Sequence, residues 1–174
     1  MTNRFLYFAY GSNMLTRRLR ATNRTPSARV EGTGFLKGYR LTFDKVSNDK
    51  SGRRSGKCDA EATGNQSDYV YGVLFSIDRI EERALDGAEG LGRGYRKDTI
   101  NVMTTDGKRT ALAYIATEKD TSLRPYDWYK ELVIAGAIEH RLPLSYVEGL
   151  RAVESQLDPD IARRDKNRRL LSRI

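Results

Sequence analysis

The stretch FLYFAYGSNML at residues 5–15 decides the fold that we expect for the start of the chain. Residues 5–10 are a short apolar and aromatic run, which is typical of a buried strand. The run ends at GSN, three residues that favour turns and helix caps. Residues 14–21 then combine apolar and basic side chains in a helical pattern. The sequence therefore predicts a strand, a tight turn and a helix.

The predicted turn at Gly11 has chemistry that suits a small anion. Glycine lets the backbone turn tightly and approach a ligand closely. The N–H groups at the start of the following helix lack partners, and the helix dipole is positive there, so a carboxylate or phosphate is favoured. An ordinary helix cap made by Ser12 or Asn13 is the alternative explanation of the same residues.

Strands dominate the first two-thirds of the chain and helices the last third. We expect strands at residues 28–43 (one or two strands), 58–63, 69–77, 97–105 and 109–117. We expect helices at residues 78–85, 125–140 and 145–157, followed by a basic helical segment. The dipeptide Asp106-Gly107 is a strong hairpin signal between the last two strands. This order indicates an α+β fold with a mostly antiparallel sheet or a small barrel.

The composition limits the chemistry that the chain can perform. Its 174 residues include one cysteine, Cys58, and one histidine, His140. This excludes a disulfide framework and the usual zinc ligand sets, and it leaves little room for a nucleophile activated by histidine. We therefore expect no zinc site and, if the chain is an enzyme, acid–base chemistry by carboxylates, Lys or Tyr. Cys58 is expected to be a buried strand residue, and His140 a structural residue at a helix end.

Basic residues exceed acidic ones by 31 to 23, a net charge of +8, and they concentrate in two places. One is residues 45–57, where 46–57 are expected to form a polar loop, and the other is residues 162–173. Binding of nucleic acid or an acidic partner through these patches is one hypothesis. Neither patch has the interleaved aromatic residues of a single-strand binder, and no DNA-binding motif accompanies them, which disfavours nucleic acid.

The organisation of the chain is expected to be simple. We assign a single domain to residues 1–155 and a basic C-terminal tail to residues 156–174. No apolar run reaches the ~20 residues of a membrane span, and the start of the chain lacks the pattern of a signal peptide. These features predict a cytoplasmic protein with no membrane association. A homodimer is left open.

Glu89 and Tyr129 are further candidates for a functional site. Glu89 lies in a glycine-rich segment, residues 86–95, where its neighbours shield it little. A solvated loop carboxylate is the alternative. The glycines precede a strand rather than a helix, so we reject a dinucleotide-binding motif. Tyr129 lies on the apolar stripe of the helix predicted at residues 125–140, where a core tyrosine is the alternative.

Together these stretches resemble the γ-glutamylcyclotransferase family. The resemblance rests on residues 5–15, on YGVLF at 71–75, on LDGAEG at 85–90 with Tyr95 after it, on YKELVIAGA at 129–137 and on LPLSY at 142–146. It covers about residues 5–150, and the first block and the Glu89 block are specific when taken together. It departs at residues 55–60, where members similar to the vertebrate enzyme carry a Trp and paired glycines.

This resemblance implies a small mixed β-barrel with flanking helices. It implies an enzyme that converts γ-glutamyl amino acids into 5-oxoproline and a free amino acid, without a cofactor, by attack of the substrate's α-amine on its own γ-carbonyl. Glu89 would be the catalytic acid–base, and Tyr129 would help to bind the substrate. The loop implied to hold the γ-glutamyl group consists of Tyr10, Gly11, Ser12, Asn13, Met14 and Leu15. A γ-glutamylamine or an acylated antibiotic precursor is the alternative substrate.

Overall fold

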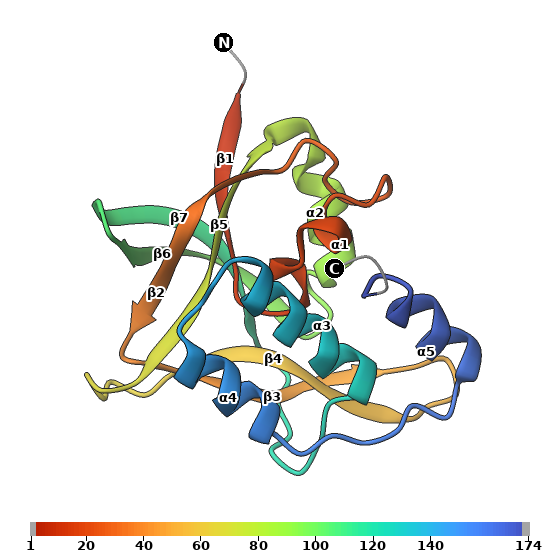
Figure 1. The fold of residues 1–174 in the computed structure, drawn as a ribbon. Coiled ribbons are helices and arrows are strands. Elements are labelled where there is room, and N and C mark those ends of the chain that lie inside the picture. Colours follow the sequence, from red (N-terminus) through yellow and green to blue (C-terminus); the bar gives the residue numbers. More distant parts are fainter. Residues whose placement is uncertain (1–2, 172–174) are drawn as a thin grey trace.

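The computed structural model describes residues 3–171 (Figure 1). In chain order its elements are β1 (Arg4–Ala9), η1 (Ser12–Met14), α1 (Thr16–Leu19), β2 (Arg29–Lys37), β3 (Tyr39–Asn48), β4 (Arg54–Ala62), β5 (Tyr69–Asp78), η2 (Arg79–Glu81), α2 (Glu82–Glu89), β6 (Tyr95–Thr104), β7 (Gly107–Ala116), α3 (Asp127–Glu139), α4 (Leu144–Ala152) and α5 (Ile161–Arg168). None of the helices in this described part is long and apolar enough to cross a membrane.

Five strands close into a barrel in the order β1-β5-β2-β6-β7. All neighbours are antiparallel except β1 and β7, which run parallel and meet at Tyr7 and Leu112. The strands β3 and β4 form a separate antiparallel hairpin. The expected α+β fold, a small mixed β-barrel with flanking helices, is confirmed.

The hydrophobic core joins the barrel to the long helix α3. Phe8 of β1, Leu74 and Phe75 of β5 and Leu132 of α3 have no exposed surface. Burial of apolar surface is the main driving force for packing such elements together. The aromatic run of β1 and the central run of β5 are therefore buried strands, as predicted.

The main departure from the sequence-based expectation is at residues 46–57, which are not a loop. The strand β3 continues to Asn48, and β4 already begins at Arg54, so that only a short turn separates them. The backbones pair in register at Lys45 with Lys57 and at Asn48 with Arg54. Polar composition hid these strands, because polar residues such as Lys45 and Ser55 are buried in them where apolar ones would mark a strand.

Three helices also differ from their predicted bounds. The helix expected at residues 145–157 already ends at Ala152, because Val153 has an extended backbone. The helix expected at residues 14–21 is divided into η1 and α1, because Leu15 between them has an extended backbone. The helix expected at residues 78–85 begins as η2 and continues as α2 to Glu89. It ends there because Gly90 adopts the left-handed conformation, with φ of 73°, that glycine permits at a helix end. Glu89 thus belongs to the end of a helix rather than to an open loop.

A buried carboxylate attaches the β3–β4 hairpin to the barrel. Asp59 of β4 is 1% exposed, and its Oδ1 accepts a hydrogen bond of 2.8 Å from the N–H of Ala116 in β7. Its Oδ2 lies 2.9 Å from Nζ of Lys119, which also lies 3.3 Å from Asp44 of β3. A buried charge of this kind requires a partner, and Lys119 provides one. The hairpin is therefore fixed beside the open end of the barrel.

The described part of the basic C-terminal segment contacts the rest of the molecule. Figure 1 shows α5 near the far end of the β3–β4 hairpin. Arg163 Nη2 lies 2.6 Å from Asp158 and 2.9 Å from Asp49 in the hairpin turn. Arg168 Nη2 lies 3.0 Å from Asp127 and 2.9 Å from Glu131 of α3. Residues 172–174 lie outside the described part, and the division of the chain after residue 155 stays a prediction.

The loop after β1 packs directly against α3 at Gly136. A Cβ atom at Gly136 would lie 2.6 Å from the backbone N of Leu15 and 2.6 Å from Cβ of Met14. These distances are shorter than real carbon contacts, so only glycine lets the helix approach the loop this closely.

We predict that Gly136→Ala lowers the free energy of unfolding by about 1–3 kcal/mol, because the added methyl group overpacks this contact. Urea unfolding monitored by circular dichroism measures the change. Gly149→Ala in α4 is the matched control, because a Cβ there meets no atom within 4 Å. The control is expected to be neutral or slightly stabilising. Equal stability of the two variants would show that the loop is not packed in this way.

Candidate active site

A cavity of about 80 Å³ lies between the barrel, the loop after β1 and the β3–β4 hairpin. The loop lines it with residues 10–13, and α2 contributes Ala88 and Glu89. Tyrosines from β1, β6, β7 and α3 and cationic side chains from α1, the following loop, β3 and β4 complete the wall. The structure therefore brings Glu89, most of the predicted loop and Tyr129 to one place.

Glu89 is held by two donors at the side of this cavity. Its Oε1 accepts a hydrogen bond of 2.7 Å from the hydroxyl of Tyr7 and a second one from Nδ2 of Asn13. Its Oε2 accepts no hydrogen bond from residues 3–171. The carboxylate is thus oriented through one oxygen, while the other remains available to a ligand.

The loop after β1 presents backbone donors beside Glu89. The N–H groups of Met14 and Leu15 donate to the carbonyls of Gly11 and Ser12. No described residue accepts a hydrogen bond from the N–H of Ser12 or Asn13. The Ser12 and Asn13 side chains do not cap the short helix, which disfavours the explanation as an ordinary helix cap.

Met14 and Leu15, which the sequence placed with the binding loop, do not line the cavity. They are 0% and 2% exposed and pack into the core beside α3. His140 at the end of α3 supports this part of the loop, because its Nε2 lies 2.9 Å from the carbonyl oxygen of Met14 and 3.1 Å from Oγ1 of Thr16. The structural role expected for His140 agrees with these contacts.

Tyr129 of α3 lines the same cavity as Glu89. Its hydroxyl accepts a hydrogen bond of 3.2 Å from the N–H of Cys58 in β4. A Cβ atom at Gly11 would lie 3.2 Å from the same hydroxyl and 3.2 Å from Cβ of Cys58, so a larger residue would narrow the cavity. Gly11 thus lets the loop approach both α3 and β4.

The tyrosines of the wall remain protonated at neutral pH. Burial is the largest cause that raises the pKa of Tyr7, Tyr10, Tyr95 and Tyr129, and the charge of Glu89 raises all four further. Tyr10 donates to the carbonyl of Tyr114, and Tyr95 donates to the carbonyl of Cys58 at 2.6 Å. These hydrogen bonds fix the shape of the wall.

Four cationic side chains line the same cavity: Arg18, Arg24, Lys45 and Lys57. Burial, followed by repulsion from Arg24, lowers the pKa of Arg18 to about 10. Burial, followed by repulsion from Arg18 and Lys45, lowers the pKa of Lys57 to about 8. Arg24 donates to Oδ1 of Asn13 at 3.1 Å. Cations that are desolvated beside one another in this way favour an anionic ligand.

Sequence reasoning missed these cations and Tyr7. Lys45 and Lys57 are cross-strand partners, and their positions became visible only once β3 and β4 were recognised as strands. Tyr7 lies inside the apolar run of β1, where its hydroxyl gave no separate signal. Arg18 was counted as the polar side of a helix. The strand expected at residues 58–63 covered only the second half of β4.

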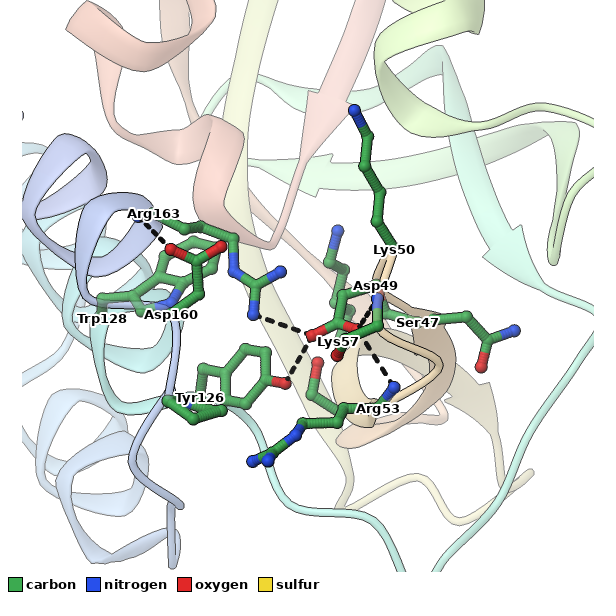
Figure 2. Close-up of a pocket in the computed structure, with 13 residues that line it drawn as sticks. Ser47, Asp49, Lys50, Arg53, Lys57, Tyr126, Trp128, Asp160 and Arg163 are labelled. Carbon is green, nitrogen blue, oxygen red and sulfur yellow. Dashed lines mark hydrogen bonds and ion pairs between the residues drawn. The ribbon is translucent and has the colours of Figure 1, made fainter.

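A second cavity, of about 870 Å³, lies between the hairpin and the helices α3 and α5. Figure 2 shows that Asp49 of the hairpin turn, one of the residues that line it, faces Arg163 and Tyr126. Hydrogen bonds from Ser51 and Arg163 hold the pKa of Asp49 below its usual range, against the opposing effect of burial. Lys57 lines this cavity as well as the one around Glu89.

No group of three or more His, Cys, Asp or Glu side chains within residues 3–171 is arranged to hold a metal ion.

Comparisons with known proteins agree with the fold. The model of the AIG2-like family matches residues 69–150. Curated γ-glutamylcyclotransferases from Homo sapiens and Mus musculus are each 36% identical over 152 residues, covering 86% of this chain and 79% of each relative. A solved structure of a gamma-glutamyl cyclotransferase matches with a TM-score of 0.81 and 29% identity, over 96% of this chain and 99% of the other. The chain belongs to the γ-glutamylcyclotransferase family.

The lowered pKa of Lys57 gives a prediction about stability. Below pH 8 the Lys57 ammonium group is charged in both the folded and the unfolded state. Partial burial makes this charge unfavourable in the folded protein, whereas water solvates it in the unfolded chain. Lys57→Met should therefore raise the free energy of unfolding at pH 7 by about 1–3 kcal/mol. This gain in the free energy of unfolding should shrink as the pH rises from about 8 towards 10.5, the ordinary pKa of lysine.

Chemical denaturation at pH 7, 8, 9 and 10 measures this dependence. Lys108→Met is the control, because Lys108 is exposed and lines neither cavity. A Lys57→Met variant whose stability relative to wild type does not change with pH would contradict the burial of a charged ammonium group.

Proposed function

We propose that this chain converts γ-glutamyl amino acids into 5-oxoproline and the free amino acid, with Glu89 as general acid and base. The observation that supports the proposal is the Glu89 carboxylate, which is oriented by Tyr7 and Asn13 and keeps Oε2 available at the cavity wall. Membership of the γ-glutamylcyclotransferase family supports the same reaction.

The reaction needs no group from the protein that bonds covalently to the substrate. The α-amine of the γ-glutamyl group attacks its own γ-carbonyl carbon and closes a five-membered ring. The bond from this carbon to the nitrogen of the leaving amino acid then breaks. A well-oriented intramolecular attack of this type has an effective molarity of ~10⁵–10⁸ M, so folding the substrate correctly is a large part of the catalysis.

Glu89 handles the protons in this proposal. Its Oε2 accepts a proton as the α-ammonium group becomes the attacking amine, and it returns this proton to the leaving nitrogen. It then accepts the second proton, which the ring nitrogen loses as the lactam forms, and this proton converts the released amine into an ammonium group. One carboxylate thus serves all these transfers, and no net proton is taken up by the protein. General acid–base catalysis of this kind contributes typically ~10²–10⁴-fold.

The loop after β1 binds the charged parts of the γ-glutamyl group. The N–H groups of Ser12 and Asn13 are available for the α-carboxylate or for the oxyanion that develops on the γ-carbonyl. Tyr10 and Gly11 line the same side of the cavity, and Tyr129 packs against the bound group from α3. Met14 and Leu15 act by fixing the loop from the core.

The substrate in this proposal is a small molecule, and neither nucleic acid nor a membrane takes part. A cytoplasmic location and a homodimer stay predictions.

We predict that Glu89→Gln lowers the rate of 5-oxoproline release from γ-glutamyl-alanine by about 10²–10⁴-fold, because an amide does not accept the α-ammonium proton. Binding of the substrate should be largely retained, since the amide oxygen still accepts from Tyr7 and Asn13. Chromatographic measurement of 5-oxoproline and calorimetric titration of the substrate check the two statements.

Glu148→Gln on the exposed side of α4 is the control and should keep the wild-type rate. A Glu89→Gln variant with a rate close to that of the wild type would exclude Glu89 as the acid and base.

A further inference from the structure

Lys57 stands out among the cations of the site because its ammonium group has no hydrogen-bond partner within the described residues. Lys45 donates to the carbonyl of Arg93 at 3.4 Å, Arg24 donates to Asn13, and Arg18 donates to Oδ1 of Asn167 at 3.1 Å. Nζ of Lys57 has neither a hydrogen bond nor an ion pair with any residue between 3 and 171. Its recorded contact is with the ring of Tyr129, 5.9 Å from the ring centre.

The charge around Glu89 exceeds what a γ-glutamyl group neutralises. Glu89 is the one carboxylate among the described residues of the cavity wall, against four cations. A γ-glutamyl group brings one α-carboxylate and one α-ammonium group, so it adds no net charge. A further negative charge on the ligand would therefore be favoured, and it would have to come from the leaving group.

Lys57 is also shared by two neighbouring cavities. It lines the cavity around Glu89 and the larger cavity between the hairpin and α5 (Figure 2). With a volume of about 870 Å³, this larger cavity has room for the remaining atoms of a substrate whose γ-carbonyl is at Glu89. There Arg163 is already paired with Asp49 and Asp158.

We infer that Lys57 binds a carboxylate carried by the leaving group, and so selects γ-glutamyl amino acids over γ-glutamylamines. The inference rests on the proposed function, and it adds a residue that determines the leaving group. Lys57 forms an ion pair with the α-carboxylate of the leaving amino acid and takes no part in proton transfer. This ion pair stabilises the bound substrate and the transition state equally. Its loss therefore raises KM and leaves kcat largely unchanged.

Two substrates that differ by one carboxylate test this role. γ-Glutamyl-alanine and γ-glutamyl-ethylamine have the same γ-glutamyl group, and ethylamine is alanine without its carboxylate. Wild type should prefer the alanine compound in kcat/KM by about 10-fold or more. Lys57→Met should lower kcat/KM for γ-glutamyl-alanine by about 10- to 100-fold, mainly through KM, and change it for γ-glutamyl-ethylamine by less than about 3-fold.

Two further variants separate the charge of Lys57 from its packing. Lys57→Arg keeps a cation and should retain most of the preference for the alanine compound. Lys108→Met should leave both substrates unaffected, since Lys108 lines neither cavity. An equal loss on both substrates in Lys57→Met, or no loss on either, would overturn the inference.

A binding measurement keeps this test independent of turnover. Calorimetric titration of both compounds into Glu89→Gln and into Glu89→Gln/Lys57→Met should show a Kd for γ-glutamyl-alanine that is about 10-fold weaker or more without Lys57. If wild type releases 5-oxoproline from neither compound, the proposed function fails, while a Kd that depends on Lys57 still supports the carboxylate site. A Kd independent of Lys57, or no binding of γ-glutamyl-alanine, overturns it.

Discussion

The contact between α3 and the loop after β1 is the constraint on which the rest of the site depends. Gly136 allows α3 to lie against Met14 and Leu15, and His140 at the end of the same helix contacts the carbonyl of Met14. With its core side fixed, the loop presents Asn13 to the carboxylate of Glu89. The barrel, α2 and α3 therefore meet at one hydrogen-bonded carboxylate, and a shift of any of them would displace it.

The site also shows a conflict between stability and function. Burial and mutual repulsion lower the pKa of Arg18 and Lys57, which means that the folded protein holds these charges unfavourably. An anionic substrate relieves this cost when it binds, and a functional site commonly gives up stability in this way. The basic C-terminal helix is different, because Arg163 and Arg168 are paired with carboxylates of the hairpin turn and of α3.

The barrel and the centre of the site were predictable from sequence because they depend on local patterns. The aromatic run before Gly11, the Asp106-Gly107 turn and the apolar stripe of α3 each identify an element without reference to the others. Glu89 and the loop followed from motifs in a fixed order and spacing. The assignment of Glu89 to an open loop was wrong, since the helix persists until Gly90 adopts its left-handed conformation.

The cationic wall was not predictable by the same reasoning. Lys45 and Lys57 meet only through the pairing of two polar strands, and Arg18 reaches the cavity only because α1 is broken from η1 at Leu15. Such positions depend on contacts between segments far apart in the chain, which composition and periodicity do not reveal. For Met14 and Leu15 the sequence motif predicted too much. It grouped them with the binding residues, whereas the structure packs both into the core.

A crystal structure of Glu89→Gln with γ-glutamyl-alanine tests the central claim most directly. We predict that the α-nitrogen of the ligand lies within about 3 Å of the side chain at position 89. Its γ-carbonyl should face the loop after β1, and its leaving group should point past Lys57. A ligand seated in the cavity between Asp49 and Arg163, with no atom in contact with position 89, would contradict the account.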